Sequence, residues 1–162
     1  MDIALVRVDN RLVHGQILEA WVPFLKASCI VVADDQVASD FFRETVIRMA
    51  VPGGVKVIVC SVSELAETYP FSRGRGPKTI VLFSKISDAW TARRLGFLFD
   101  ELNIGNVYNE ECKLCCTPAV LLSDEDIRNI IGLQDAGVKI ELRNCPGEKP
   151  LDLFEIVRKM QS

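Results

Sequence analysis

The chain has 162 residues, enough for one domain with a substantial core, and its composition, 49% hydrophobic and 25% charged, excludes a disordered chain. The net charge of −3 argues against a dedicated nucleic-acid binder, because such domains are usually basic. No uncharged apolar run approaches the ~20 residues of a membrane helix, and the first residues lack a secretory signal, so we expect a cytoplasmic protein that does not itself span a membrane.

Strand and helix patterns alternate along the whole chain. In its first half they predict a strand at 3–8, a helix at 15–24, a strand at 29–33, a helix from Asp34-Asp35 to Ala50, a strand at 55–60 and a helix from Ser61 or Ser63 to Tyr69-Pro70. The second half gives a strand at 79–83, a helix capped by Ser87-Asp88 to about Phe99, a strand at 102–107, an irregular extended region at 114–122 broken by Pro118, a helix from Ser123 to Gly137, a last strand at 138–142 and a terminal helix from Pro150.

This alternation predicts an α/β fold. Short, nearly continuous apolar strands between amphipathic helices are typical of an open, mostly parallel, doubly wound sheet with helices on both faces. We expect a single domain. Ligands of such sheets bind at the carboxyl ends of the strands. Those ends place on one rim the polar residues His14, Asp34, Asp35, Ser61, Ser84 and Asn106.

His14 is the only histidine of the chain, and it lies where the first strand leads into the first helix. The free amides and the dipole of a helix N-terminus favour an anion. Imidazole can accept and release a phosphoryl group near neutral pH, because one ring nitrogen is nucleophilic there. The alternative is a turn histidine that only makes local hydrogen bonds.

The neighbours of His14 favour the functional interpretation. Arg11 can bind phosphate oxygens through its guanidinium fork. Asp9 can accept the N–H of one ring nitrogen and leave the other as the nucleophile. Gly15 permits a close approach of the backbone to a ligand. Together these residues predict a phosphoryl site around His14.

The run from Arg7 to Gln16 reads Arg-Val-Asp-Asn-Arg-Leu-Val-His-Gly-Gln. It closely resembles the signature of the IIB component of the mannose/fructose/sorbose family of the sugar phosphotransferase system (PTS). That signature is Arg-hydrophobic-Asp-x-Arg, two hydrophobic residues and His-Gly-Gln. Later stretches resemble the family in the same order, at residues 30–38, 51–57, 102–106 and 136–141. The resemblance thus covers nearly the whole chain and implies one sorbose-type IIB domain over residues 1–162.

The resemblance implies a phosphotransferase that acts as a phosphocarrier without a cofactor or a metal. A phosphorylated IIA protein or domain would give its phosphoryl group to Nδ1 of His14, which would pass it to a sugar held by the membrane IIC and IID components. We expect a cytoplasmic protein, peripherally associated with this permease. Arg11 is expected to stabilise the transferring group, and Asp9 to orient the ring or hold Arg11. The expected phosphate-binding groups are the backbone amides of Gly15 and Gln16 and the hydroxyl of Ser84.

Two other functions remain open at this stage. One is a regulatory phosphohistidine protein that delivers its phosphoryl group to no sugar. The other is an unrelated small-molecule binder or nucleotide-handling enzyme on the same fold, since fold does not determine function. The chain has no glycine-rich phosphate-loop motif, which argues against nucleotide handling.

Two further features have alternative interpretations. Cys112, Cys115 and Cys116 have a C-x2-C-C spacing that suggests a zinc or redox site. In a strand, however, the adjacent Cys115 and Cys116 point to opposite faces, which favours packing and no metal. Cys29 and Cys60 lie in apolar runs and are expected in the core. The basic stretch 73–78 could bind an acidic partner or a phosphate, but we expect a solvated loop at the amino end of a strand.

Overall fold

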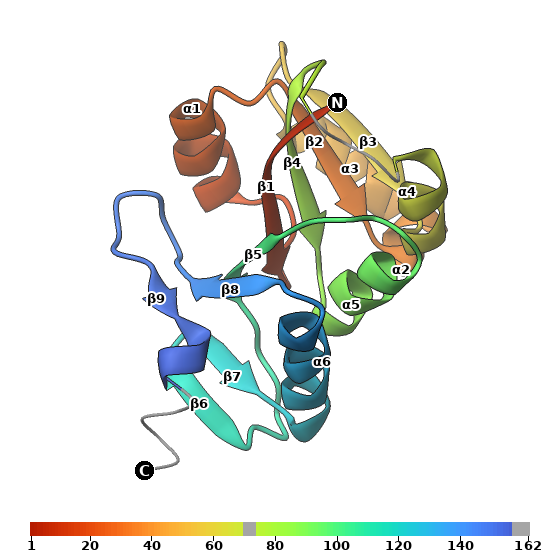
Figure 1. The fold of residues 1–162 in the computed structure, drawn as a ribbon. Helices are drawn as coiled ribbons and strands as arrows, with labels where there is room; N and C mark the ends of the chain where they lie inside the picture. Colours follow the sequence, from red (N-terminus) through yellow and green to blue (C-terminus); the bar gives the residue numbers. More distant parts are fainter. Residues whose placement is uncertain (70–73, 157–162) are drawn as a thin grey trace.

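The computed structural model describes residues 1–69 and 74–156, and a seven-stranded sheet forms its centre (Figure 1). The strand order is β3-β2-β4-β1-β5-β8-β9. The strands are β1 (Asp2–Asp9), β2 (Cys29–Ala33), β3 (Lys56–Cys60), β4 (Lys78–Phe83), β5 (Glu101–Asn106), β8 (Lys139–Leu142) and β9 (Leu151–Asp152). The strands from β3 to β8 in this order pair in parallel, and β9 pairs antiparallel with β8. The predicted open, mostly parallel sheet is confirmed.

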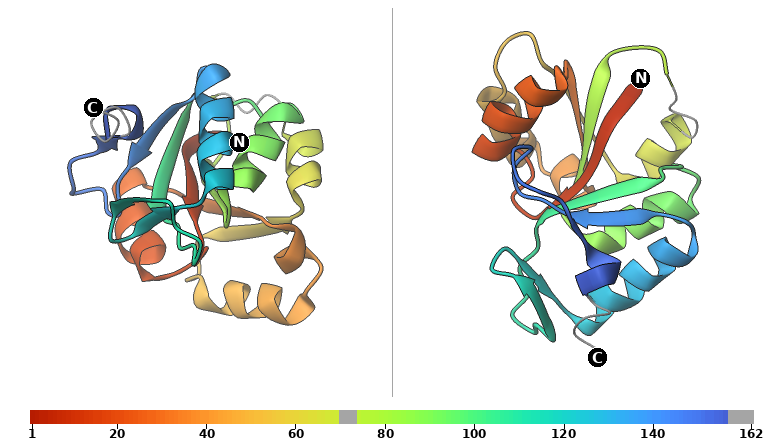
Figure 2. Two further views of the ribbon diagram at one scale, coloured as in Figure 1. Left: turned by 90° about the horizontal axis from the view of Figure 1, so that it is seen from below. Right: turned by 60° about the vertical axis from the view of Figure 1, so that its left-hand side comes forward.

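Helices cover both faces of the sheet (Figure 2). They are the π-helix η1 (Gln16–Trp21), α1 (Val22–Leu25), α2 (Asp35–Ala38), α3 (Phe41–Ala50), α4 (Val62–Thr68), α5 (Ile86–Arg94) and α6 (Asp124–Asp135). Side chains of α4, α5 and α6 belong to the core on one face, and those of η1 and α2 belong to the core on the other. The doubly wound arrangement is therefore also confirmed. In the described parts of the chain, none of the helices combines the length and apolar character that crossing a bilayer requires.

Burial on both faces explains the uninterrupted apolar runs of the sequence. In β2, Val31 packs in the core beneath α4 and α5, whereas Ile30 and Val32 pack beneath η1. Successive side chains of a strand point to opposite faces, so a strand covered on both sides needs apolar residues at every position. All five residues of β2 are accordingly buried.

The topology places the loop after β1 at the point where the strand order reverses. β1 pairs with β4 on one side and with β5 on the other. The chain leaves β1 for β2 on the β4 side and adds β5 and β8 on the opposite side only later. Such a switch point is where ligands bind in open α/β sheets, beyond the carboxyl ends of the strands.

Two helices differ from their predicted form near capping residues. The helix expected from Asp34-Asp35 to Ala50 is two helices, because the carboxylate of Asp40 accepts the Arg43 N–H at 3.2 Å and starts α3. Aspartate stabilises a helix N-cap better than a helix interior, which favours this break. The helix expected at 15–24 begins as the π-helix η1. Pro23 has no N–H to donate, so the α-helical bonding pattern is interrupted there.

The helix expected to be capped by Ser87-Asp88 begins at Ile86 and ends earlier than predicted. No side chain caps it at Lys85, and its last residue is Arg94. Gly96 then adopts a left-handed φ of 109°, which a right-handed helix cannot continue. The turn brings Phe97 and Phe99 back into the core as loop residues. Their apolar side chains continue the helical spacing of the sequence, which explains why the predicted helix was too long.

The C-terminal third contains two elements that the pattern did not predict correctly. Residues 114–122 form an antiparallel hairpin of β6 (Leu114–Thr117) and β7 (Val120–Leu122), with Pro118 in its turn. β8 is not the last strand, because β9 follows Pro150 where we expected a helix to start. Helical residues begin only at Leu153, after the carboxylate of Asp152 accepts the Phe154 N–H at 2.9 Å. The rest of the predicted terminal helix lies outside the described residues.

The loop before β4 has the solvated character expected of it. Residues 74–78 are exposed at the amino end of β4, and the N-terminal ammonium of Met1 donates to the Arg75 carbonyl oxygen at 2.7 Å. Arg73, and Pro70 at the predicted end of α4, lie outside the described residues.

Candidate functional site

The loop that carries His14 is shaped by one residue in an unusual conformation. Leu12 has a φ of 55°, in the left-handed region, and its N–H donates to the Asp9 carbonyl oxygen at 2.9 Å. This conformation costs an L-residue roughly 1–2 kcal/mol. Burial of the Leu12 side chain beside Ile17 offsets the cost. With Leu12 turned into the core, His14 lies at the rim of the sheet.

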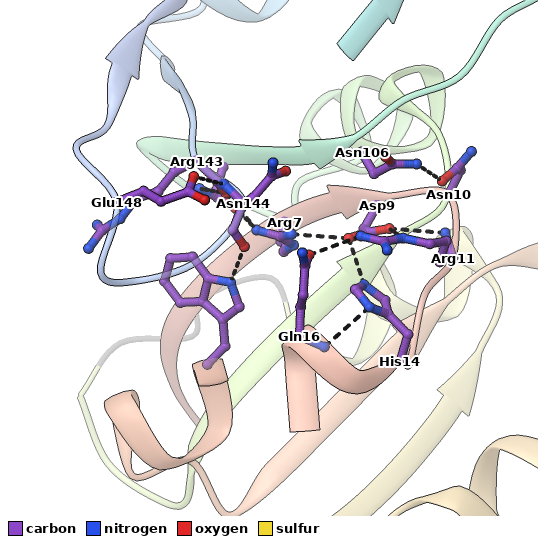
Figure 3. A network of polar contacts seen from close by, with 12 residues as sticks. Arg7, Asp9, Asn10, Arg11, His14, Gln16, Asn106, Arg143, Asn144 and Glu148 are labelled. Carbon is purple, nitrogen blue, oxygen red and sulfur yellow. Dashed lines mark hydrogen bonds and ion pairs between the residues drawn. The ribbon is translucent and has the colours of Figure 1, made fainter. Parts of the chain in front are cut away.

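A pair of asparagines ties the same loop to the neighbouring strand. The Asn10 N–H donates to the Asn106 carbonyl oxygen at 3.0 Å, and the Asn106 side-chain amide donates to Oδ1 of Asn10 (Figure 3). Asn106 is the last residue of β5, so the loop after β1 is fastened to the carboxyl end of β5. The expectation that Asn106 and His14 share one rim is confirmed.

Both ring nitrogens of His14 have a hydrogen-bond partner (Figure 3). Nε2 lies 2.8 Å from Oδ2 of Asp9. A carboxylate only accepts hydrogen bonds, so Nε2 carries the proton of this contact. Nδ1 accepts the backbone N–H of Gln16 at a long distance of 3.4 Å. The side chain is 15% exposed, and in this arrangement Nδ1 is the ring nitrogen that presents a lone pair.

Asp9 is a fully buried carboxylate with four hydrogen-bond donors. Oδ2 accepts from Nη2 of Arg7 at 3.1 Å as well as from His14, and Oδ1 accepts from the backbone N–H and Nε of Arg11 at 3.0 and 3.3 Å. Burial acts to raise the pKa of Asp9. The hydrogen bonds from His14 and from the Arg11 amide, together with the charge of Arg7, outweigh it and hold the pKa of Asp9 below its usual range. Asp9 is therefore a fixed negative charge behind the imidazole.

Arg11 presents a partly exposed cation beside His14. Its side chain is 44% exposed, and Nη2 donates to Oε1 of Gln16 at 2.9 Å. The contact with Asp9 anchors the guanidinium at Nε. A guanidinium in this position can bind an anion next to the imidazole.

Arg7 also belongs to this network, and the sequence interpretation assigned it no role at the site. It is fully buried, and besides Asp9 it donates to Oδ1 of Asn103 at 2.6 Å and to the Arg143 carbonyl oxygen at 2.8 Å. Its guanidinium also lies 5.5 Å from the ring centroid of Trp21, in a cation–π contact. A charged residue inside the apolar run of β1 was the available signal, because a buried cation requires a buried partner.

The comparisons with known proteins agree with this geometry. The sequence model of the family described as the PTS system sorbose subfamily IIB component matches residues 3–162. The chain belongs to this family. IIB components accept a phosphoryl group from a IIA partner and transfer it to a sugar, which confirms the function class that the resemblance implied.

Relatives of this IIB protein cover it from end to end. The fructose-specific EIIB component of Bacillus subtilis is 34% identical over 99% of this chain and 98% of its own length. The mannose-specific EIIAB component of Escherichia coli is 28% identical over 99% of this chain and 50% of its own length. The crystal structure of the IIBSor domain of the sorbose permease from Klebsiella pneumoniae is 31% identical, covers 98% of each chain and superposes with a TM-score of 0.88.

The other predicted rim residues of this IIB protein form a cluster at the ends of β2, β3 and β4. Ser84 donates its hydroxyl to Oδ2 of Asp34, whose Oδ1 caps α2 by accepting the Val37 N–H at 2.9 Å. Asp35 accepts the Val62 N–H at 2.9 Å, and Ser61 caps α4. Among the described residues no hydrogen bond joins Ser84 to His14. The Ser84 hydroxyl would have to break its hydrogen bond with Asp34 before it could donate to a phosphoryl oxygen.

The six cysteines of this IIB protein are free thiols that differ in burial, from the core to the exposed Cys115. Cys29 and Cys60 are buried in the core, as expected. Cys115 and Cys116 lie on β6, and Cys112 lies just before that strand. Within residues 1–69 and 74–156 there is no group of three or more histidine, cysteine or acidic side chains that could hold a metal ion.

The acidic cluster has a testable effect on stability. Burial, and then the charges of Asp34 and Asp35, raise the pKa of Asp88 to about 6, against the opposing charge of Lys85. The folded protein thus binds a proton that an ordinary carboxyl releases near pH 4, so Asp88 lowers stability as pH rises through this window. We expect Asp88→Asn to raise the free energy of unfolding by about 1–2 kcal/mol at pH 8, allowing for solvent screening, and by nothing at pH 3.5.

Urea unfolding of both proteins across this pH range measures the difference. Asp124→Asn is the matched control, because Asp124 is exposed in the first turn of α6. That change should give no stabilisation that grows with pH. An Asp88→Asn effect that is the same at every pH would contradict a raised pKa for Asp88.

Proposed function

We propose that His14 is the phosphoryl acceptor of this IIB protein and that Nδ1 carries the group. The observation that supports it is the contact of Nε2 with Asp9, which leaves Nδ1 as the only unprotonated ring nitrogen. Phosphoryl transfer depends mainly on positioning and on stabilisation of charge on the equatorial oxygens. Asp9 positions the ring, and Arg11 provides the nearby charge.

The step can be written for these atoms. The Nδ1 lone pair of His14 attacks the phosphorus of a phosphorylated IIA protein, the bond from phosphorus to the donor breaks, and the donor keeps that electron pair. Nε2 keeps its proton, so the phosphorylated ring becomes cationic and is stabilised by the Asp9 carboxylate. We propose that Arg11, the amides of Gly15 and Gln16, and the Ser84 hydroxyl once released from Asp34 bind the phosphoryl oxygens.

The destination that we propose is a sugar held by the membrane components IIC and IID. The protein then acts as a protein-phosphohistidine–sugar phosphotransferase in the cytoplasm, peripherally associated with that permease. The mannose-specific relative is named an EIIAB component, and this chain matches half of it, which supports a IIA protein as the donor. The relatives named for sorbose and fructose support a sugar as the acceptor.

Reconstitution tests this function. The protein is incubated with phosphoenolpyruvate, the general PTS proteins and a IIA partner, and its intact mass is recorded at alkaline pH. We expect a gain of one phosphoryl group that is lost on acidification, and sugar phosphate when membranes with IIC and IID are added. An unmodified mass in the presence of verified phospho-IIA from several PTS families would refute the proposal.

Arg11 should act mainly in the onward step. Arg11→Lys keeps a cation, but it removes both the fork that can bind two phosphoryl oxygens and the Nε contact with Asp9. We expect sugar phosphate formation to slow by about tenfold or more, and labelling of His14 to slow less. Single-turnover labelling and chase by sugar measure the two steps separately. Arg43→Lys, on α3, is the control, and equal slowing of both steps in Arg11→Lys would be evidence against this role.

A further inference from the structure

The guanidinium of Arg7 is held in the interior of the protein by three hydrogen bonds from its two terminal nitrogens. Nη1 donates to the Asn103 side chain and to the Arg143 carbonyl oxygen, and Nη2 donates to Oδ2 of Asp9. Asn103 is itself held, because its amide donates to Oε1 of Glu141 at 3.1 Å. Both Arg7 and Asp9 have fully buried side chains. A network with this many fixed contacts has little freedom to rearrange.

A glycine makes room for this arrangement. Gly105 on β5 lies against the Arg7 side chain, and a Cβ at this position would fall 1.8 Å from Nη2 and 2.1 Å from Cζ of Arg7. Heavy atoms cannot approach so closely without displacement. Any residue larger than glycine at position 105 therefore has to push the guanidinium away from its partners.

Arg7 and His14 meet at a single oxygen atom. Oδ2 of Asp9 accepts from Arg7 at 3.1 Å and from Nε2 of His14 at 2.8 Å, while Oδ1 is occupied by Arg11 (Figure 3). With both oxygens engaged, the carboxylate cannot rotate about its bond to Cβ. The direction in which Oδ2 points, and thus the nitrogen of His14 that it engages, depends on the buried cation behind it.

We propose that Arg7 is a positioning residue for phosphoryl transfer: it holds Asp9 so that the proton of the neutral imidazole stays on Nε2 and the lone pair stays on Nδ1. This inference rests on the proposed role of His14. Arg7 has no contact with the imidazole among the hydrogen bonds of the described residues and acts through Asp9.

The position of the imidazole proton governs both the accepting step and the onward step of the transfer. In the accepting step a Nε2–H ring attacks with Nδ1 without losing a proton. In the onward step a hydroxyl oxygen of the sugar forms the new O–P bond and releases its proton to solvent, while the N–P bond breaks and Nδ1 recovers its electron pair. A ring that still carries the Nε2 proton then leaves as neutral imidazole, whereas a deprotonated ring would have to leave as an anion. The Arg7 charge disfavours proton transfer from Nε2 to Asp9, because it stabilises the carboxylate.

Two variants displace the cation in different ways. Arg7→Met removes the charge and keeps most of the apolar stem, and Gly105→Ala keeps every charge but pushes the guanidinium aside. The matched control is Gly132→Ala on α6. Its Cβ would fall 2.8 Å from the Trp90 ring, so it brings a steric conflict of the same kind at a helix away from His14.

The readout is the ¹⁵N NMR spectrum of the imidazole, recorded on the full-length protein at about pH 8.5, where an ordinary imidazole is neutral. The chain has one histidine, so every imidazole signal belongs to His14. We expect one Nε2–H tautomer in the native protein and in Gly132→Ala, and a mixture of tautomers in Arg7→Met and Gly105→Ala. Transfer from phospho-IIA should fall about tenfold or more in these two variants and remain unchanged in the control.

The outcomes separate a positioning role from a structural one. A native Nε2–H tautomer in Gly105→Ala, which retains Arg7, would overturn the proposal even if Arg7→Met fails to fold. Unchanged transfer in a folded Gly105→Ala protein would overturn it as well. If native protein shows the Nε2–H tautomer but takes no phosphoryl group, the proposed function fails, while the tautomers of the variants still show whether Arg7 positions the ring.

Discussion

Replacing His14 by alanine will abolish labelling of this protein by a phosphorylated IIA partner. The reason is chemical: the chain has a single imidazole, and the described site offers no other nitrogen nucleophile next to a guanidinium. The side chain is 15% exposed and Leu12 supplies the buried contacts of the loop, so the fold should survive the change. The measurement is the intact mass after incubation with phosphoenolpyruvate, the general PTS proteins and IIA.

Thiols are the other nucleophiles to exclude. Cys115→Ser is the matched control, because Cys115 is the exposed thiol on β6. This variant should gain one phosphoryl group as the native protein does. Full labelling of His14→Ala, with loss of labelling in Cys115→Ser, would transfer the acceptor role from the imidazole to a thiol.

Replacing Asp9 by asparagine should have the second largest effect, on both stability and transfer. An amide in place of the carboxylate leaves the buried Arg7 without its counter-ion, which costs roughly 3–5 kcal/mol in comparable buried pairs. It also offers an N–H to His14 in place of an acceptor and favours the wrong tautomer. We expect transfer to fall by roughly 10⁴-fold, as when the buried aspartate of a catalytic triad becomes asparagine.

The loss of stability in Asp9→Asn should depend on pH with a definite sign. The pKa of Asp9 is lowered in the folded protein, so its ionisation stabilises the fold above the ordinary carboxyl pKa of 3.8. That contribution is lost as pH falls through the lowered pKa. The difference in urea midpoint between native protein and variant should therefore be full at pH 7 and shrink below pH 4. Asp126→Asn, which removes the charge of a carboxylate in the α6 capping box, should not slow transfer. A folded Asp9→Asn protein with native transfer would contradict the role of Asp9.

The sequence predicted most of the fold because burial imposes a simple pattern. β2 is buried at all five positions and β4 at five of six, so their apolar runs identify them without ambiguity. The errors occur where a capping side chain or a glycine turn ends a helix although the spacing of apolar residues continues. Asp40 ends one helix and starts another, and Gly96 turns Phe97 and Phe99 into the core outside a helix. β9 has only two residues, too few for any strand pattern to emerge.

The candidate site was predictable for residues near His14 in the chain and not for distant ones. Asp9 is the last residue of β1, and Arg11 and His14 lie in the loop that follows, so the contacts of Asp9 with both follow from proximity in the chain. Arg7 depends on Asn103 and on the backbone of Arg143, which are 96 and 136 residues away. The strand order brings these segments together, and local sequence patterns do not predict that order. The small size of Gly105 likewise has meaning only beside Arg7.

NMR of the ¹⁵N-labelled, phosphorylated protein would identify the nitrogen of His14 that carries the phosphoryl group, which we propose is Nδ1. Because the chain has one histidine, a single set of imidazole signals reports which nitrogen is bonded to phosphorus. The contact between Nε2 and Asp9 predicts phosphorus on Nδ1 and a proton retained on Nε2. Phosphorus on Nε2 would mean that the ring leaves Asp9 to react, and this would contradict the proposal that Asp9 holds Nε2 while Nδ1 accepts the phosphoryl group.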